Sequence, residues 1–159
     1  MKTQLSLMML ALITFMSCAP QPQPIHLNSD NCAHCRMMIS DGEFASQLLN
    51  TQGRAFKFDS VECLAAFDLT NENPESVHSR WVPNFKNPSE WLEAESAVYL
   101  HSETLRSPMG LYISAYASSD EASEMMQEYG GSVVGYDYVL DLVAKEWLNQ
   151  GGHTMHSQH

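Results

Sequence analysis

The sequence has few basic residues and contains no segment rich in Lys or Arg. Its 8 Lys and Arg residues face 19 Asp and Glu residues, and the formal net charge is −11 at pH 7. Surfaces that bind nucleic acid usually carry a basic patch, so this composition argues against DNA or RNA as a partner. Hydrophobic residues make up 44% and charged residues 17% of the chain, as in ordinary folded proteins. A chain of 159 residues is sufficient for one compact domain.

The apolar segment near the N-terminus is too short to cross a bilayer. It spans residues 5–16, whereas a membrane-spanning helix needs about 20 apolar residues. Together with the positive charge of Lys2, a segment of this length is typical of a secretory signal peptide. We therefore assign residues 1–17 to a signal peptide, which directs export and takes no part in the fold.

Residues 15–18 read Phe-Met-Ser-Cys and resemble a bacterial lipobox, although Phe15 stands where Leu is commoner. Cys18 is therefore the predicted lipidated first residue of the mature protein. The alternative is a soluble secreted protein cut near Ala19. The Pro-rich stretch that follows cannot form a core and favours a polyproline-like conformation. Residues 18–29 are thus predicted to be a lipidated tether that holds the folded part off the membrane.

The first part of the folded region predicts two strands followed by a helix. Residues 44–49 and 55–58 are predicted to be short strands on either side of a turn at 50–53, with Phe56 and Phe58 on the same face, which is typical of a hairpin. Asp59, with Glu62 three positions later, has the spacing of a capping box and predicts the start of a helix that carries Cys63.

The second part of the folded region predicts a similar succession of strands and helices. We expect a strand at 111–117, a helix opened by Ser118 and ended at Gly130, and a strand at 132–136. Asp137 is expected to cap the closing helix. Between the two parts, residues 81–91 are interpreted as a connection interrupted by proline, followed by a brief strand at 97–100.

Residues 53–64 and 131–142 share a Gly, an aromatic-Asp pair, a Val and a Leu at one constant offset. This similarity indicates an internal duplication. We therefore predict an α+β fold in which two pseudo-repeated strand-strand-helix units form one compact domain over residues 30–150. Residues 151–159, rich in His and Met, are predicted to be a flexible tail.

The segment Cys32-Ala33-His34-Cys35-Arg36-Met37 carries the clearest chemistry in the chain. A Cys-x-x-Cys spacing lets two thiols bind one metal ion, and soft thiolate and thioether ligands favour soft ions such as Cu(I). Met109 lies between Pro108 and Gly110, in a turn that does not place it on a helix face.

Three other interpretations compete at the cysteine pair: a disulfide, a structural zinc site and a thioredoxin-like redox pair. A redox Cys-x-x-Cys usually follows a strand and opens a helix, whereas here a Pro-rich tether precedes it. Zinc would need a second Cys or His pair, and none with the usual spacing occurs in the folded region. The disulfide remains an alternative.

Further candidates have more than one interpretation. Cys63, in the first turn of its helix, is either a ligand whose pKa is lowered by the helix dipole or a small buried apolar residue. His34 either completes a metal site or faces solvent. The His/Met tail at 151–159 either collects copper or is an ordinary terminus.

At these residues the sequence resembles the NosL family of lipid-anchored copper chaperones for nitrous-oxide reductase. The segment at 32–37 resembles the family's Cys-x-x-Cys-Gly-Met, and the Phe-Asp pair at 58–59 with Glu62 and Cys63 resembles its Phe-Asp segment. Trp91, Pro108-Met109-Gly110 and Gly130-Gly131 follow in the family's order. Arg36 replaces the family's glycine, so the backbone after Cys35 must either avoid a positive φ or accept the strain.

The resemblance implies an α+β domain of the organomercurial-lyase type that binds Cu(I). Its sulfur donors would be Cys32, Cys35, Met37 and Met109, of which any one copper ion would use only two or three. It also implies a chaperone without catalytic activity, anchored to the membrane and facing the periplasm. Its partner would be apo nitrous-oxide reductase or the maturation complex of that enzyme. The internal duplication would bring Met109 toward the cysteines at a seam shared by the two units.

Two other functions stay open at this point. One is a thiol-dependent enzyme, either similar to an organomercurial lyase or a disulfide oxidoreductase, in which Asp59 would act as the acid partner. The other is a structural lipoprotein whose cysteine pair forms a permanent disulfide.

Overall fold

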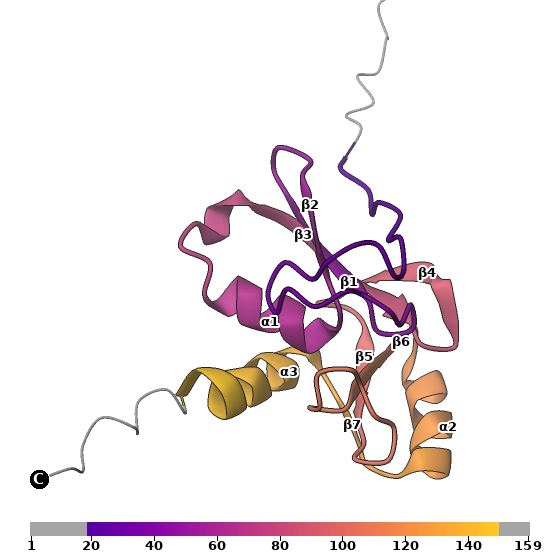
Figure 1. The fold of residues 1–159 in the computed structure, drawn as a ribbon. Helices are drawn as coiled ribbons and strands as arrows, with labels where there is room; N and C mark the ends of the chain where they lie inside the picture. Colours follow the sequence, from indigo (N-terminus) through magenta and orange to yellow (C-terminus); the bar gives the residue numbers. More distant parts are fainter. Residues whose placement is uncertain (1–18, 150–159) are drawn as a thin grey trace, which may run out of the picture.

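The structure is a computed structural model and describes residues 19–149. Within these residues, the first sheet has four antiparallel strands in the order β2-β1-β3-β4, namely β1 (Ser46–Asn50), β2 (Ala55–Phe58), β3 (Val77–Asn84) and β4 (Asn87–Glu93). The second sheet has the order β6-β5-β7, with β5 (Val98–His101), β6 (Ile113–Tyr116) and β7 (Ser132–Val134). Figure 1 shows the two sheets and the helices around them.

The helices follow the strands in chain order. Helix α1 (Val61–Leu69) follows β2, α2 (Ser119–Tyr129) lies between β6 and β7, and α3 (Tyr136–Val143) continues into the π-helical η2 (Ala144–Leu148). A short 3-10 turn, η1 (Pro74–Ser76), leads into β3. The predicted α+β class and single compact domain are therefore confirmed, while Cys18, residues 1–17 and the tail at 151–159 lie outside the described residues.

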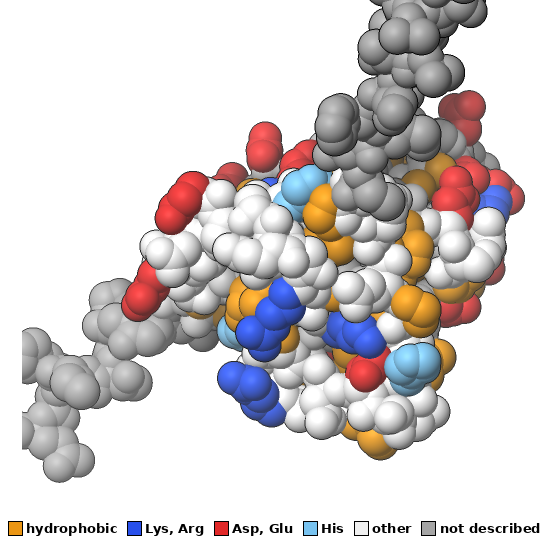
Figure 2. Space-filling model, turned by 90° about the horizontal axis from the view of Figure 1, so that it is seen from above, with side chains coloured by type: hydrophobic (Ala, Val, Ile, Leu, Met, Phe, Trp, Pro, Cys, Tyr) orange, Lys and Arg blue, Asp and Glu red, His pale blue; other side chains and the backbone are white. Residues whose placement is uncertain are grey.

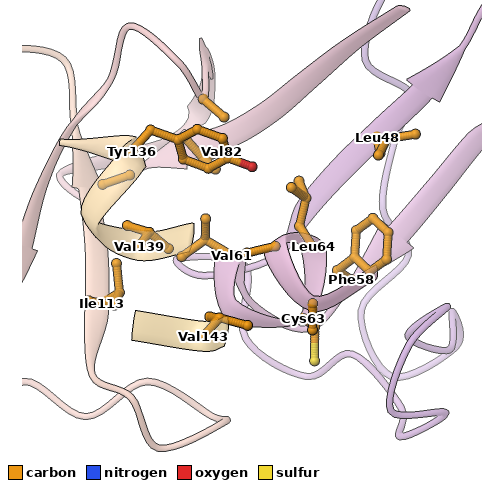
Figure 3. Close-up of a cluster of buried hydrophobic side chains, with 14 of the residues drawn as sticks. Leu48, Phe58, Val61, Cys63, Leu64, Val82, Ile113, Tyr136, Val139 and Val143 are labelled. Atoms are coloured by element: carbon orange, nitrogen blue, oxygen red, sulfur yellow. The ribbon is translucent and has the colours of Figure 1, made fainter. Parts of the chain in front are cut away.

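Helix α1 is the central element of the core. Six consecutive residues, from 61 to 66, are buried, because α1 packs against the first sheet on one side and α3 on another. Arg80 of β3 fixes the helix to the sheet with two hydrogen bonds to Asp68, at 2.6 and 3.0 Å. Figure 3 shows Val61 and Leu64 of α1 within this core, together with Val139 and Val143 of α3.

The predicted strands and helices are largely confirmed, but two helix caps differ. Ser60, and not Asp59, caps α1, because its hydroxyl accepts a hydrogen bond from the backbone N–H of Cys63 at 3.4 Å. Gly135 precedes α3, and Asp137 lies in the first turn of that helix instead of capping it. Ser118 caps α2 as predicted and accepts from Glu121 N at 3.2 Å.

The prediction that residues 81–91 form an irregular connection is wrong. Residues 81–84 belong to β3 and residues 87–91 to β4, and the two strands pair as an antiparallel hairpin with a turn at 85–86. Pro83 argued against a strand here, because proline lacks the N–H that a residue in a central strand donates. Pairing between β1 and β3 is recorded only up to Trp81, and a register shift follows Pro83 on the β4 side. Pro83 therefore lies where the missing N–H disrupts little.

The internal duplication is visible in the strand-to-helix units β2-α1 and β7-α3, which contain the matching residues. The second half differs from the first because α2 is inserted between its strands β6 and β7. The two equivalent helices, α1 and α3, pack against each other. A seam between the halves thus runs along α1.

The Pro-rich segment is docked on the domain at Gln23. Backbone N–H of Gln23 donates to the side chain of the buried Gln47 at 2.9 Å, and the Gln47 amide donates back to Gln23 O at 2.5 Å. The Gln23 side chain also donates to Gly53 O at 3.2 Å. The folded part therefore begins earlier than the predicted residue 30.

None of the helices among the described residues is both long enough and apolar enough to cross a membrane. On the face shown in Figure 2, acidic side chains concentrate toward the edges and a few Lys and Arg side chains lie nearer the middle. This distribution agrees with the acidic composition of the chain.

Candidate metal centre

Three cysteine thiols meet at one end of α1. The Sγ atoms of Cys32, Cys35 and Cys63 all lie within 4.8 Å of one another. Cys32 and Cys63 are buried, with exposures of 1% and 0%, whereas Cys35 is half-buried. All three are free thiols. Sequence spacing brought together only the first two, and Cys63 joins them because α1 starts beside the loop.

The loop that carries Cys32 and Cys35 is closed by its own backbone. Cys32 N donates to Met37 O at 2.8 Å, and Arg36 N donates to Cys32 O at 3.1 Å. Ala33 N donates to Lys57 O at 2.8 Å, which attaches the loop to β2. These bonds hold the first cysteine against α1, where its side chain meets Cys63.

Arg36 occupies the conformation that the expected glycine would adopt freely. Its φ is +68°, in the left-handed region, where a residue with a Cβ atom is disfavoured by about 1–2 kcal/mol. The backbone after Cys35 therefore keeps the tight turn and accepts the strain. The bend also turns Cys35 N toward Cys32 Sγ, to which it donates at 3.4 Å.

Hydrogen bonding makes Cys32 the most acidic thiol of the cluster. Donation by the Cys63 thiol and by the backbone N–H groups of Asp59 and Cys35 outweighs burial and lowers the pKa of Cys32 to about 4. The pKa of Cys63 is raised well above its usual value, because its proton is held in the bond to Cys32 and because it is buried. The predicted lowering of the Cys63 pKa by the helix dipole is therefore wrong. Burial also raises the pKa of Cys35.

Asp59 adds a buried carboxyl group beside the cluster. Its exposure is 3%, and its Oδ1 atom has no hydrogen-bond partner among the described residues. Burial, and next the negative charge of Cys32, raise the pKa of Asp59, although a backbone hydrogen bond from Ser40 opposes the shift. The sequence predicted that Asp59 caps α1. In the structure Asp59 is instead a buried residue beside the cysteine cluster.

The two predicted methionine ligands are placed differently. Met37 is exposed, at 50%, and its backbone carbonyl accepts the hydrogen bond from Cys32 N that closes the cysteine loop. Met109 is half-buried and packs against the core cluster that contains Cys32 and Cys63. Its turn is closed by Gly110 N donating to Ser107 O at 3.3 Å, and Gly110 has a φ of +82°.

His34 lies outside the three-thiol cluster that could hold a metal. Its ring instead stacks on Trp147 of η2, with ring centroids 6.2 Å apart and an interplanar angle of 6°. The half-buried imidazole thus connects the cysteine loop to the end of the closing helix.

Helix α1 also contains a buried polar residue that was not predicted from the sequence to be part of the site. Glu62 is fully buried, and its Oε1 accepts a hydrogen bond from the Ser107 hydroxyl. The available signal was a carboxylate within the otherwise apolar run at 61–66, which was explained as half of a capping box. Such a residue in a buried helix usually has a specific partner.

The donor set and its spacing suit a soft metal ion. A thiolate-bound ion at about 2.3 Å from each of three sulfurs would place those sulfurs about 4 Å apart in a trigonal site, which agrees with the spread of the thiols. Three thiolates are soft ligands, and a hard ion such as Mg²⁺ would prefer oxygen.

Comparison with known proteins extends over nearly the whole described chain. The model of the NosL family matches residues 24–144. The fold is similar to that of the copper chaperone NosL from Shewanella denitrificans, with a TM-score of 0.64 and 22% sequence identity. That match covers 74% of this chain and 94% of the Shewanella chain. Among curated proteins, none matches the sequence significantly.

Proposed function

This chain belongs to the NosL family, and on that basis we propose that it is an extracytoplasmic, lipid-anchored carrier of Cu(I). We further propose that it delivers the ion to the maturation of nitrous-oxide reductase and performs no catalysis. The observation that carries the proposal is the group of three thiols within 4.8 Å of one another.

The different burial of the three thiols supports a carrier that holds its ion and releases it. Cys32 and Cys63 are closed off from solvent, whereas Cys35 is half-buried and Met37 is exposed next to it. A buried thiolate pair protects the ion from water and chelators. A third sulfur at the surface can exchange with a ligand of the partner, so the ion can pass without being released into solution.

The membrane attachment rests on Cys18, and the client rests on the family. The lipobox-like segment at 15–18 supports a lipid anchor on the outer side of the cytoplasmic membrane or in the outer membrane. The family's link with nitrous-oxide reductase supports that enzyme, in its metal-free form, as the acceptor of the ion.

A competition titration tests the metal site. The full-length mature protein is titrated with Cu(I) against a coloured Cu(I) chelator under anaerobic conditions. We expect one ion per protein, with affinity strongly reduced in Cys32→Ser, Cys35→Ser and Cys63→Ser. Met125→Leu, at a methionine in the separate core beside α2, is the matched control and should bind like the unaltered protein. Equal affinity in all four variants would reject the cysteine cluster as the site.

Delivery and anchoring need separate measurements. Purified apo nitrous-oxide reductase should gain copper from the loaded protein faster than from the same concentration of chelated Cu(I). Cys18→Ala should move the protein from the membrane fraction to the soluble fraction. Transfer no faster than from the chelator would argue against a carrier for this client.

A second function is favoured by one observation, the position of Asp59. Its backbone donates to Cys32 and its buried carboxyl group has a raised pKa, so it could supply a proton next to a thiolate-bound metal, as an organomercurial lyase requires. Turnover of methylmercury that is lost in Asp59→Asn would support this enzyme, whereas metal binding without turnover would leave the carrier.

A further inference from the structure

A buried hydrogen bond joins the two halves of the chain next to the cysteine cluster. Ser107, in the loop between β5 and β6, donates its hydroxyl proton to Glu62 of α1. Glu62 has 0% exposure and Ser107 has 6%. The second carboxylate oxygen of Glu62, Oε2, has no hydrogen-bond partner among the described residues.

The Ser107 end of this bond organises the turn that carries Met109. The Ser107 hydroxyl also accepts from the backbone N–H of Tyr112 at 2.9 Å, and Ser107 O accepts from Gly110 N at 3.3 Å. Gly110 and Tyr112 both have positive φ, at +82° and +58°. The turn is therefore a specific shape that closes on the single side chain of Ser107.

The Glu62 end of the bond belongs to the helix that presents Cys63. Glu62 immediately precedes Cys63, whose backbone N–H is in turn held by the cap residue Ser60 at 3.4 Å. Met109 packs against the core cluster that includes Cys32 and Cys63. One hydrogen bond thus fixes the methionine turn relative to the end of α1 where the thiols meet.

Stability alone does not account for a carboxyl group at this position. Burial of an ionisable group is costly, and replacement of a buried polar pair by apolar residues of similar volume is often neutral or stabilising. Burial raises the pKa of Glu62, and among its hydrogen-bond partners the Ser107 hydroxyl of the methionine turn lowers this pKa most, ahead of the Ser60 side chain and the backbone groups of Glu62 and Ile113. The arrangement is therefore better explained by a need to place the turn.

We propose that Glu62 and Ser107 form a clamp that holds the Met109 thioether against the cysteine cluster, so that the second half of the chain supplies a sulfur ligand to the bound ion. This inference rests on the proposed Cu(I) function. Glu62 and Ser107 are positioning residues in it and do not touch the ion. Met109 is the residue through which they act.

The test combines affinity with a count of sulfur ligands. In the full-length mature protein, Met109→Leu should weaken Cu(I) binding at least about 10-fold, because it removes a ligand and loss of even an outer partner of a ligand costs about 10–100-fold. Ser107→Ala should weaken it by the same factor. The double variant should be no weaker than either single variant, because both remove the same ligand. X-ray absorption should show one sulfur neighbour fewer in each variant than in the unaltered protein.

Glu62→Leu separates positioning from stability. Combined with Ser107→Ala, which removes the hydroxyl that Glu62→Leu would leave unpaired, it should give a metal-free protein about as stable to thermal unfolding as the unaltered one, while Cu(I) affinity falls as in Met109→Leu. Ser107→Thr keeps the hydroxyl and should restore binding. Ser114→Ala, at another buried serine whose hydroxyl contacts Tyr116, is the control and should leave both the affinity and the sulfur count unchanged.

The outcomes distinguish this inference from the function on which it rests. If the unaltered protein binds no Cu(I), the carrier function fails and the clamp fails with it. If the cysteine variants lose binding but Ser107→Ala and Glu62→Leu keep the full affinity and sulfur count, only the clamp is wrong. Full affinity in Met109→Leu would likewise overturn the clamp and leave the thiol site intact.

Discussion

Helices α1 and α2 are of similar length but are built for different tasks. In α1 six consecutive residues are buried, among them the carboxylate of Glu62 and the thiol of Cys63. In α2 only Ala122 and Met125 are buried, and the remaining positions carry mostly polar residues toward solvent. A helix that covers a sheet needs one apolar stripe. A helix that is buried on several sides and still contains polar groups indicates a site, and in this protein it is α1 that meets the thiols.

The largest expected effect is on the free energy of unfolding, which substitutions in α1 and α2 should lower by different amounts. Leu64→Ala in α1 removes a side chain with 0% exposure from the central core, so we expect it to lower the free energy of unfolding by about 3–4 kcal/mol. Met126→Ala in α2, which likewise removes a large apolar side chain but from a half-buried position, should lower it by only about 1 kcal/mol. Urea denaturation of the metal-free protein measures both. Equal effects would contradict the central role of α1.

The next largest effect is on Cu(I) affinity and concerns the removal of a sulfur atom from α1 or from α2. Cys63→Ser should lower Cu(I) affinity by about 100-fold or more, because it removes one of three thiols within 4.8 Å and loss of even an outer partner of a ligand costs about 10–100-fold. Met125→Leu in α2 removes a thioether that lies in a separate core and should change the affinity less than twofold, within the range of control variants. Chelator competition compares the two directly.

The acidity of the thiol beside α1 predicts a pH dependence. The pKa of Cys32 is about 4 in the folded protein, below the value of about 8.5 expected in the unfolded chain. A lowered pKa stabilises the fold fully above the unfolded pKa, and this stabilisation is lost as the pH falls toward the folded pKa. Between about pH 5 and 8 the unfolding free energy should therefore rise with pH, by at most about 1.4 kcal/mol per unit.

The comparison of metal-free wild type with Cys32→Ser, made in an Asp59→Asn background, isolates this contribution, because burial and the charge of Cys32 both raise the pKa of Asp59 and the effect of that charge would differ between the two proteins. The difference between their unfolding free energies should grow with pH over this window. In parallel, the ultraviolet absorbance of one thiolate should persist at pH 6 in the wild type and be absent from Cys32→Ser. A thiolate that appears only above pH 8 would show that Cys32 is an ordinary thiol.

The smallest effect concerns the strained turn. Arg36→Gly relieves a φ of +68° and should stabilise the protein by about 0.5–1 kcal/mol, since the strain removed exceeds the flexibility gained by the unfolded chain. Arg106→Gly replaces an arginine that does not have a positive φ and should be neutral or destabilising. Thermal unfolding of both variants gives the comparison. Destabilisation by Arg36→Gly would show that contacts of the arginine side chain stabilise the fold by more than the backbone strain costs.

The local patterns in the sequence were sufficient for the main elements. The alternation at 55–58, the Ser118 cap and the glycines after α2 are short-range signals, and each corresponds to an observed element. The β3–β4 hairpin was missed because Pro83 is a strong local signal, and its tolerance depends on how far β1 extends alongside it. That information lies in the pairing of distant strands.

The candidate site likewise has one part that local sequence patterns predict and another that depends on the packing of distant segments. The Cys-x-x-Cys spacing predicts that Cys32 and Cys35 act together whatever the fold. The addition of Cys63, and the burial of Asp59 and Glu62 around it, depend on where α1 packs, which the sequence does not specify locally. Both carboxylates fitted a capping box in the sequence, although Ser60 performs the capping. A residue type that suits two roles can be assigned only from its neighbours.

The attachment of Gln23 to Gln47 limits how far the domain can travel. With Cys18 lipidated as proposed, only five residue steps separate the acyl chains from the docked Gln23, and a fully extended chain spans at most about 18 Å over that number. The domain is then confined to a thin zone at the bilayer surface and cannot search the periplasm for an acceptor. Copper exchange would require a recipient that itself approaches the membrane, so the rate of encounter would be governed by diffusion in two dimensions.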